Sequence, residues 1–323
     1  MQKLNARFVL ISLLLSACLF CMVSYSYSGD LFTPEEYAEK IDYTNDFCVI
    51  VMDLCTGEDI FVRDPQSMLD KPMAMGSIIK PFTIIAKFRN NPVDIGETHY
   101  CDAYNENVRD EEKCWLLAGH GRLTLIPALA HSCNTYFYNF SKDIDFALYV
   151  SVLQEWGVIP GRSAFTRRFL NPVERSMALI GKMNIMHIRA TDLISAYAKI
   201  FTQKDAPHLA VSAREAILDG MRMVYTVGTA KSSREKLFMP DYLPVYCKTG
   251  TGVYEDSDGV DIRRTNGFFI GVYDFRYMVY VGALETTGSH AASYIGLSVL
   301  NYFAVRDTNS VQYISEDIIN DKL

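Results

Sequence analysis

Residues 76–88, GSIIKPFTIIAKF, decide the fold, because here the chain changes from strand-like to helix-like sequence. The pattern predicts a helix from Ser77, in which the ammonium group of Lys80 lies on the same face as the Ser77 hydroxyl. Gly76 suits a tight entry and places Ser77 at the positive end of the helix dipole. A serine becomes a nucleophile when a base takes its proton, and a lysine kept neutral by burial can be that base. Ser77 and Lys80 are therefore candidate catalytic residues.

The same spacing occurs at Ser233 and Lys236, which provides a comparison within the chain. That copy lies in the charged segment KSSREK, with no apolar helix behind it to bury the lysine. We predict a solvated surface loop there, and no nucleophile.

A second motif, Ser132-Cys133-Asn134, joins the helix-like segments ALAHS and NTYFYNF. From such a loop, Ser132 could relay a proton to a departing amine, and Asn134 could hold a substrate carbonyl and Lys80. The alternative is structural, because either Ser132 or Asn134 could be the N-cap of the second helix.

A third motif, Lys248-Thr249-Gly250-Thr251, ends a strand-like run. Lys248 supplies positive charge, Thr249 and Thr251 can bind a carboxylate, and Gly250 lets a substrate backbone approach the strand. The backbone N–H groups of Thr251 and Ser77 could together form an oxyanion hole.

In this order along the chain, the three motifs resemble those of the penicillin-recognising serine acyl-transferases, which are the penicillin-binding proteins and serine β-lactamases. Residues 75–82, MGSIIKPF, are similar to the GSxxKPF segment of class B penicillin-binding transpeptidases. Residues 128–137, ALAHSCNTYF, are similar to that family's segment around its SxN motif. The resemblance extends over residues 47–305.

The resemblance implies a D,D-transpeptidase that acts on peptidoglycan stem peptides. Ser77 would attack the carbonyl between two terminal D-alanines, with Lys80 as base, and Ser132 would pass the proton to the departing D-alanine. Lys248 and Thr249 would hold the terminal carboxylate. An amine of a neighbouring strand, or water, would release the acyl-enzyme, and β-lactams would trap Ser77. We predict neither a cofactor nor a metal.

Two other classes of function stay open. A hydrolase, either a D,D-carboxypeptidase or a β-lactamase, would use water as acceptor, although class D β-lactamases usually carry valine where Asn134 stands. The other class is a protein without turnover, either a β-lactam sensor or a scaffold of a cell-wall complex. It stays open because residues 181–183 are Gly-Lys-Met, where the family commonly has Gly-Gln-Gly.

The wider pattern predicts one α+β domain. Strand-like runs at 47–53, 59–63, 243–248, 268–274 and 277–284 surround a largely helical middle, with helices expected at 124–131, 134–142, 191–201, 213–227 and 292–305. We therefore expect an antiparallel sheet in which the N-terminal hairpin joins the C-terminal strands, packed with a helical subdomain. Residues 47–305 would be the transpeptidase domain, and residues 306–323 a C-terminal tail.

The N-terminal segment predicts export. Lys3 and Arg7 precede residues 8–23, FVLISLLLSACLFCMV, which carry no charge. Residues 1–28 are thus expected to be an uncleaved signal anchor or a lipoprotein signal with Cys18 lipidated, with simple cleavage as a third alternative. A linker helix is expected within residues 29–46, which are too few for another folded domain. A membrane-anchored, extracytoplasmic domain follows, with a protein partner in a cell-wall complex to position it.

Charge and cysteine content narrow the remaining possibilities. The net charge of −7 argues against a nucleic-acid partner. Cys101 and Cys114 flank a polar stretch and could either form a disulfide or remain free thiols. No CxxC or HExxH spacing is present, so the sequence does not predict a zinc site.

Overall fold

The computed structural model describes residues 33–90, 93–102, 113–161, 170–182, 186–256 and 259–320. The chain divides into residues 1–33 and 34–323, and the description concerns the second unit. The expected signal segment, 1–28, lies outside the described residues. Within the described part, no helix is both long enough and apolar enough to cross a bilayer.

Five of the described strands form an antiparallel sheet with the order β2-β1-β9-β8-β7. The strands are β1 (Phe47–Asp53), β2 (Glu58–Arg63), β7 (Val245–Asp256), β8 (Gly259–Tyr273) and β9 (Tyr277–Ala283). The first hairpin joins the C-terminal strands through β1 and β9, which pair from Phe47 opposite Ala283 to Asp53 opposite Tyr277. The predicted α+β class and the predicted return of the N-terminal hairpin are confirmed.

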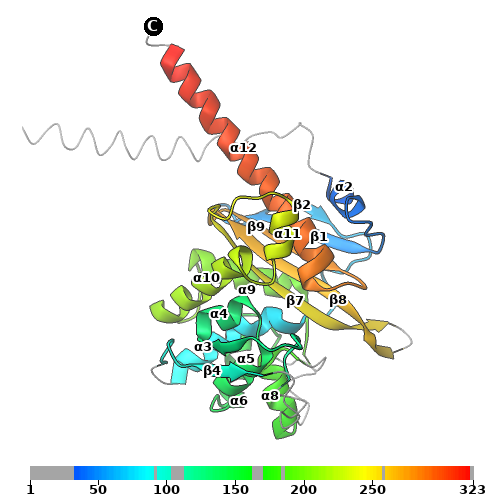
Figure 1. The fold of residues 1–323 in the computed structure, drawn as a ribbon, viewed down its shortest axis with the longest axis vertical. Coiled ribbons are helices and arrows are strands. Elements are labelled where there is room, and N and C mark those ends of the chain that lie inside the picture. The colour runs from blue at the N-terminus through cyan, green and yellow to red at the C-terminus, as the bar shows by residue number, and fades with distance from the viewer. Residues whose placement is uncertain are drawn as a thin grey trace, which may run out of the picture. The chain divides into compact units, whose positions relative to one another are not determined.

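Helices cover both faces of this sheet (Figure 1). One face carries α12 (Ser293–Asn320), preceded by the π-helical turn η2 (Gly288–Ala292), with α2 (Pro34–Glu39) and α11 (Lys231–Lys236) beside it. The other face carries the helical subdomain, formed by α3 (Lys80–Asn90), α4 (Leu125–Ala130), α5 (Asn134–Phe140), α6 (Phe146–Glu155), α8 (Pro172–Ile180), α9 (Ala190–Thr202) and α10 (Val211–Thr226).

Side chains of β8 alternate between these two layers, as the pleat of a strand requires. Phe268 and Ile270 belong to the core shared with the helical subdomain. Phe269 points to the other face and packs against α12 at Gly296, where a Cβ atom would lie 2.2 Å from the Phe269 ring. The central strands β1 and β9 and the buried part of β8 are therefore covered on both faces, whereas the edge strand β2 is largely exposed.

Two short ribbons complete the helical subdomain. β3 (Met73–Ala74) pairs with β6 (His187–Ile188), and β4 (His99–Cys101) pairs with β5 (Gly121–Leu123).

Several predicted elements differ from the structure. Ser77 lies in a 3₁₀ turn, η1 (Gly76–Ile79), and α3 begins only at Lys80. Pro81 has no N–H to donate, so it suits the first turn of α3 and would interrupt a helix that began earlier. The final helix does not stop at residue 305 but continues to Asn320.

The loop predicted around the second serine–lysine pair is wrong. These residues form α11, in which the Ser233 side chain is buried and its hydroxyl lies 2.7 Å from that of Ser293. Lys236 is exposed at the end of the same helix. The buried hydroxyl and the exposed ammonium cannot act as a nucleophile and base.

Candidate active site

Ser77 lies where η1 packs against strand β7. Gly76, with φ of +60°, starts the turn, and a Cβ atom on it would lie 2.0 Å from the Thr251 carbonyl oxygen. Gly250 of β7 in turn lies against the Met75 carbonyl, where a Cβ atom would come within 2.3 Å. Only glycine permits such close backbone contact. The contact brings Ser77 beside the third motif.

The 3₁₀ turn also aligns Ser77 with Lys80. The Lys80 N–H donates to the Ser77 carbonyl, and side chains three residues apart eclipse in this geometry. Tyr197 of α9 stabilises the turn, because its hydroxyl donates a hydrogen bond to the Ile78 carbonyl at 2.6 Å. The predicted α-helix would place side chains three residues apart less nearly in line than a 3₁₀ turn does.

Lys80 is fully buried and contacts the second motif. Its Nζ donates to the Ser132 carbonyl at 2.8 Å and to Asn134 Oδ1 at 2.9 Å, and it lies 3.4 Å from Ser132 Oγ. Burial, the largest influence, lowers the pKa of the Lys80 ammonium to about 8. The thiols of Cys114 and Cys133 oppose this shift, and the charge of Lys182 adds to it. The neutral amine is thus a minor form at neutral pH, but a far larger fraction than in an exposed lysine.

Neither Ser132 nor Asn134 is the N-cap of α5, so the structural alternative for the second motif is wrong. Cys133 is the N-cap of α5, and its sulfur accepts from the Tyr136 N–H at 3.4 Å. Ser132 and Asn134 are therefore free of that role, and both line the cavity described below. Ser132 has φ of +53°, a left-handed conformation that is costly for a serine and that is often found at functional sites.

Lys248 reaches the same serine from the sheet. Its buried Nζ donates to Ser132 Oγ at 3.0 Å and to the Thr249 carbonyl at 2.7 Å. Burial, followed by the charge of Lys80, holds the pKa of the Lys248 ammonium well below its usual value. No carboxylate among the described residues pairs with Lys80 or Lys248. The two amines form a buried basic centre on either side of one hydroxyl.

Residues of all three motifs line a cavity of about 330 Å³, whereas Lys80 and Lys248 are fully buried behind the hydroxyl of Ser132 and are not among its lining residues. Its lining includes Ser77, Ser132, Asn134, Thr249, Gly250 and Thr251, which the sequence singled out, together with Trp115, Gly181, Lys182, Thr229, Thr287 and Ser289. Thr229 is a site residue that the motif analysis did not assign, and its hydroxyl lies 2.6 Å from that of Thr249. Thr251 Oγ1 accepts from the Gly288 N–H at 3.1 Å, which connects η2 to β7.

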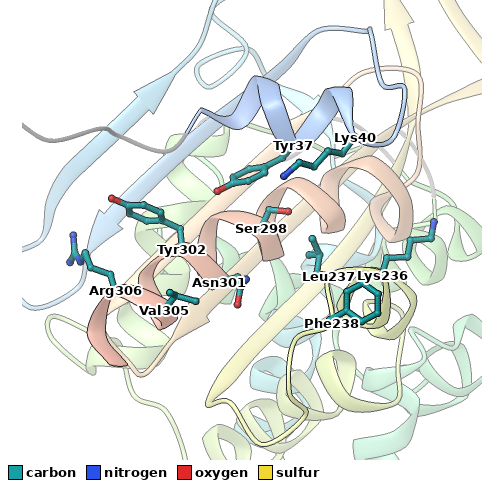
Figure 2. Close-up of a pocket in the computed structure, with 10 residues that line it drawn as sticks. All are labelled: Tyr37, Lys40, Lys236, Leu237, Phe238, Ser298, Asn301, Tyr302, Val305 and Arg306. Carbon is teal, nitrogen blue, oxygen red and sulfur yellow. The ribbon is translucent and has the colours of Figure 1, made fainter. Parts of the chain in front are cut away.

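A larger cavity, of about 580 Å³, lies away from these motifs. Figure 2 shows it between α2, α11 and α12, with Tyr37 and Lys40 facing Ser298 and Tyr302. None of the predicted site residues lines it. The chemistry is therefore concentrated in the smaller cavity.

Cys101 and Cys114 are not joined by a disulfide in the structure, and both carry free thiols. Of the two alternatives that the sequence left open, the structure has the unpaired one. Both thiols lie beside His120.

Comparison with known proteins gives a consistent family. The family profile "Penicillin binding protein transpeptidase domain" matches residues 47–301. A comparison with curated protein sequences finds no match.

Three solved structures with the same fold illustrate how distant such relatives can be in sequence. PBP2 of Helicobacter pylori, in a complex with MreC, has a TM-score of 0.66 at 16% identity, over 85% of this chain and 62% of that one. PBP2 of Pseudomonas aeruginosa has a TM-score of 0.66 at 16% identity, over 84% of this chain and 76% of that one. The transpeptidase domain of Burkholderia pseudomallei penicillin-binding protein 3 has a TM-score of 0.67 at 18% identity, over 85% and 92%.

The chain thus spans less than two thirds of the Helicobacter pylori protein, and the likeness to these structures concerns the fold. The profile match covers most of the chain, and the same residues carry the three motifs that meet at one cavity. The chain belongs to the family of penicillin-binding protein transpeptidase domains.

Proposed function

We propose that the chain is a serine D,D-transpeptidase that crosslinks peptidoglycan stem peptides and binds β-lactams covalently. Ser77 Oγ attacks the carbonyl carbon between two terminal D-alanines, and neutral Lys80 accepts the hydroxyl proton. The peptide C–N bond then breaks, and Ser132 passes a proton to the departing amine. An acceptor amine attacks the resulting ester, forms the new amide, and releases Ser77.

The observation that carries this proposal is the buried basic centre. Lys80 and Lys248 lie on either side of the Ser132 hydroxyl, at 3.4 and 3.0 Å, without a carboxylate partner among the described residues. Burying ammonium groups without a counter-ion is costly, so this cavity favours a ligand that carries a carboxylate. A terminal D-alanine and a β-lactam both carry one, and Thr249 lies beside Lys248 to receive it.

A fluorescent penicillin tests the acylation step. The purified chain is expected to form a covalent adduct that survives denaturing electrophoresis, and Ser77→Ala is expected to form none. Ser233→Ala is the matched control, because it removes the other serine of the same spacing and should label as the wild type does. Absence of label on the wild-type chain would leave only a role without acylation.

Incubation with a pentapeptide substrate and an acceptor amine, followed by mass analysis, separates the remaining alternatives. Crosslinked product is expected from a transpeptidase. Loss of the terminal D-alanine alone would indicate a carboxypeptidase, and hydrolysis of the penicillin adduct would indicate a β-lactamase. A stable adduct with no peptide product would indicate a sensor.

We further infer that residues 1–28 anchor the chain to the membrane and that the transpeptidase domain is extracytoplasmic. We also infer that the chain has a protein partner in a cell-wall complex. Two structures of the same fold support a partner, namely the Helicobacter pylori complex of PBP2 with MreC and a peptidoglycan synthase complex. In spheroplasts, externally added protease should degrade the chain, whereas protection until the membrane is lysed would contradict this location. Crosslinking in cells, followed by capture of the chain, should recover a cell-wall protein.

A further inference from the structure

Three thiols and one imidazole meet behind the second motif. The donor atoms of Cys101, Cys114, His120 and Cys133 all lie within 4.8 Å of one another. His120 Nδ1 is 3.6 Å from the Cys101 sulfur and 3.5 Å from the Cys114 sulfur, and the sulfurs of Cys114 and Cys133 are 3.9 Å apart. All three cysteines are buried and none forms a disulfide.

The fold brings these four residues together from separate parts of the chain. Cys101 ends β4 and pairs in register with Gly121, the first residue of β5, so the preceding residue, His120, lies next to it. Cys133 caps α5. Cys114 comes from the segment before β5 and lies against the same cap, where its sulfur accepts from the Asn134 N–H at 3.4 Å.

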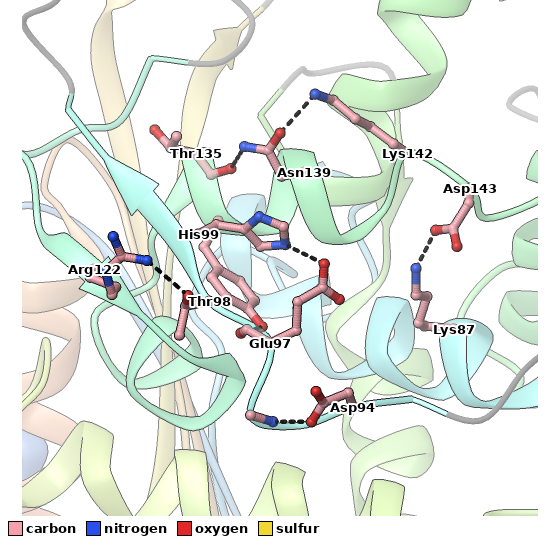
Figure 3. A network of polar contacts seen from close by, with 12 residues as sticks. Lys87, Asp94, Glu97, Thr98, His99, Arg122, Thr135, Asn139, Lys142 and Asp143 are labelled. Atoms are coloured by element: carbon pink, nitrogen blue, oxygen red, sulfur yellow. Dashed lines mark hydrogen bonds and ion pairs between the residues drawn. The ribbon is translucent and has the colours of Figure 1, made fainter.

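The surrounding polar contacts hold the ribbon that carries Cys101 and His120. Figure 3 shows Arg122 of β5 donating to Thr98, at 3.1 Å, and Glu97 paired with His99 of β4. The His99 ring packs edge-on against Tyr136 of α5, with centroids 5.0 Å apart. The ribbon that carries Cys101 and leads from His120 is thus packed against α5, the helix that Cys133 caps.

Their chemistry fits a soft divalent cation. Three thiolates and one imidazole are a common structural zinc set, and zinc binds them tetrahedrally at about 2.0–2.3 Å. Donor atoms on a sphere of that radius are about 3.3–3.8 Å apart, close to the separations found here. Thiols alone would form only weak hydrogen bonds in this buried place.

We propose that Cys101, Cys114, His120 and Cys133 bind one Zn²⁺ ion, which holds the Ser132–Asn134 loop in position. Cys133 lies between these two residues, so a Zn–S bond would fix the backbone that carries both. Ser132 has its left-handed conformation in that loop. The neighbouring Trp115 also braces the loop, because its Nε1 donates to the His131 carbonyl at 3.1 Å.

Metal content tests the site without reference to activity. The full chain, purified under reducing conditions, should contain stoichiometric zinc by mass spectrometry. After chelation, added Co²⁺ should produce thiolate-to-cobalt charge-transfer bands and the intense visible bands of a tetrahedral site. Cys114→Ser and His120→Ala should weaken or abolish both signals. Cys48→Ser, which alters an equally buried cysteine on β1, should leave both unchanged.

Three results would overturn the metal site: no zinc and no cobalt bands in the folded wild-type chain, a Cys101–Cys114 disulfide in the freshly isolated protein, or equal metal loss in Cys48→Ser. The role in the loop rests on the proposed function and has its own readout. Chelation should slow penicillin acylation about 10- to 100-fold, and zinc should restore it. Unchanged acylation after complete zinc removal would refute that role while leaving the metal site standing.

Discussion

We expect the substitution Gly181→Ala to have two effects, a steric clash next to the active site and backbone strain, which a matched control variant can distinguish. Gly181 ends α8 with φ of +69°, and a Cβ atom on it would lie 2.2 Å from the Gly76 carbonyl oxygen. Gly76 begins the turn that carries Ser77. In Gly181→Ala, the Gly76 carbonyl would have to move by about 1 Å to regain ordinary contact.

Gly157 provides the matched control. It follows α6 with φ of +79°, and the nearest atom to an added Cβ is Lys199 Nζ at 3.8 Å, an ordinary contact. Gly157→Ala should therefore lose only the left-handed preference of glycine, about 1–2 kcal/mol. Gly181→Ala should lose this and a further 1–3 kcal/mol or so for overpacking.

Urea unfolding, monitored by tryptophan fluorescence, measures the free energy of unfolding of each variant. Fluorescent penicillin measures the acylation rate of each. Because a displacement of about 1 Å can slow a reaction 100-fold, Gly181→Ala should acylate about 10- to 100-fold more slowly. Gly157→Ala should acylate at the wild-type rate. Equal stability losses in the two variants, together with normal acylation in Gly181→Ala, would refute the claim that this contact positions Ser77.

Other groups carry predictions that can be checked on the same protein. The penicillin acylation rate should rise with pH, with its midpoint near the Lys80 pKa of about 8, since only the neutral amine accepts a proton; a rate independent of pH across that range would exclude Lys80 as base. Thr229→Val removes the hydroxyl that lies 2.6 Å from the Thr249 hydroxyl and should weaken pentapeptide binding by roughly 2- to 12-fold, whereas Thr229→Ser should bind like the wild type. Equal KM values for the wild type and Thr229→Val would argue against a positioning role of Thr229. Trp156→Ala leaves a cavity beside Phe82, whose ring centroid lies 6.0 Å from that of Trp156, and should lower the free energy of unfolding by about 3–5 kcal/mol, measured by urea unfolding. A loss below about 1 kcal/mol would contradict close packing around Trp156.

Much of the fold was accessible from local pattern. The strand at 47–53 has the predicted bounds, and the helices of the middle region lie within a few residues of their predicted positions. Errors occurred where one local rule competed with another. At Ser77 the helical spacing was correct, but Pro81 and the close contact at Gly76 produce a 3₁₀ turn before the helix.

The cysteine cluster shows a different kind of failure. Zinc motifs such as CxxC have ligands close together in sequence, whereas the four ligands here lie on separate segments, at Cys101, Cys114, His120 and Cys133. Each is unremarkable in its own surroundings. Their proximity depends on how the β4–β5 ribbon packs against α5, which no short motif encodes.

By itself, the sequence determined the residue types of the site, the strand and helix periodicities, and the family that they resemble, because these are properties of neighbouring residues. The tertiary structure decided which functional groups touch. Lys248 lies 116 residues from Ser132 in the chain, yet its Nζ reaches the Ser132 hydroxyl. That contact requires the sheet and the helical subdomain to pack together, with glycines where their backbones meet. The same packing removes water from both lysines, and burial rather than sequence lowers their pKa values.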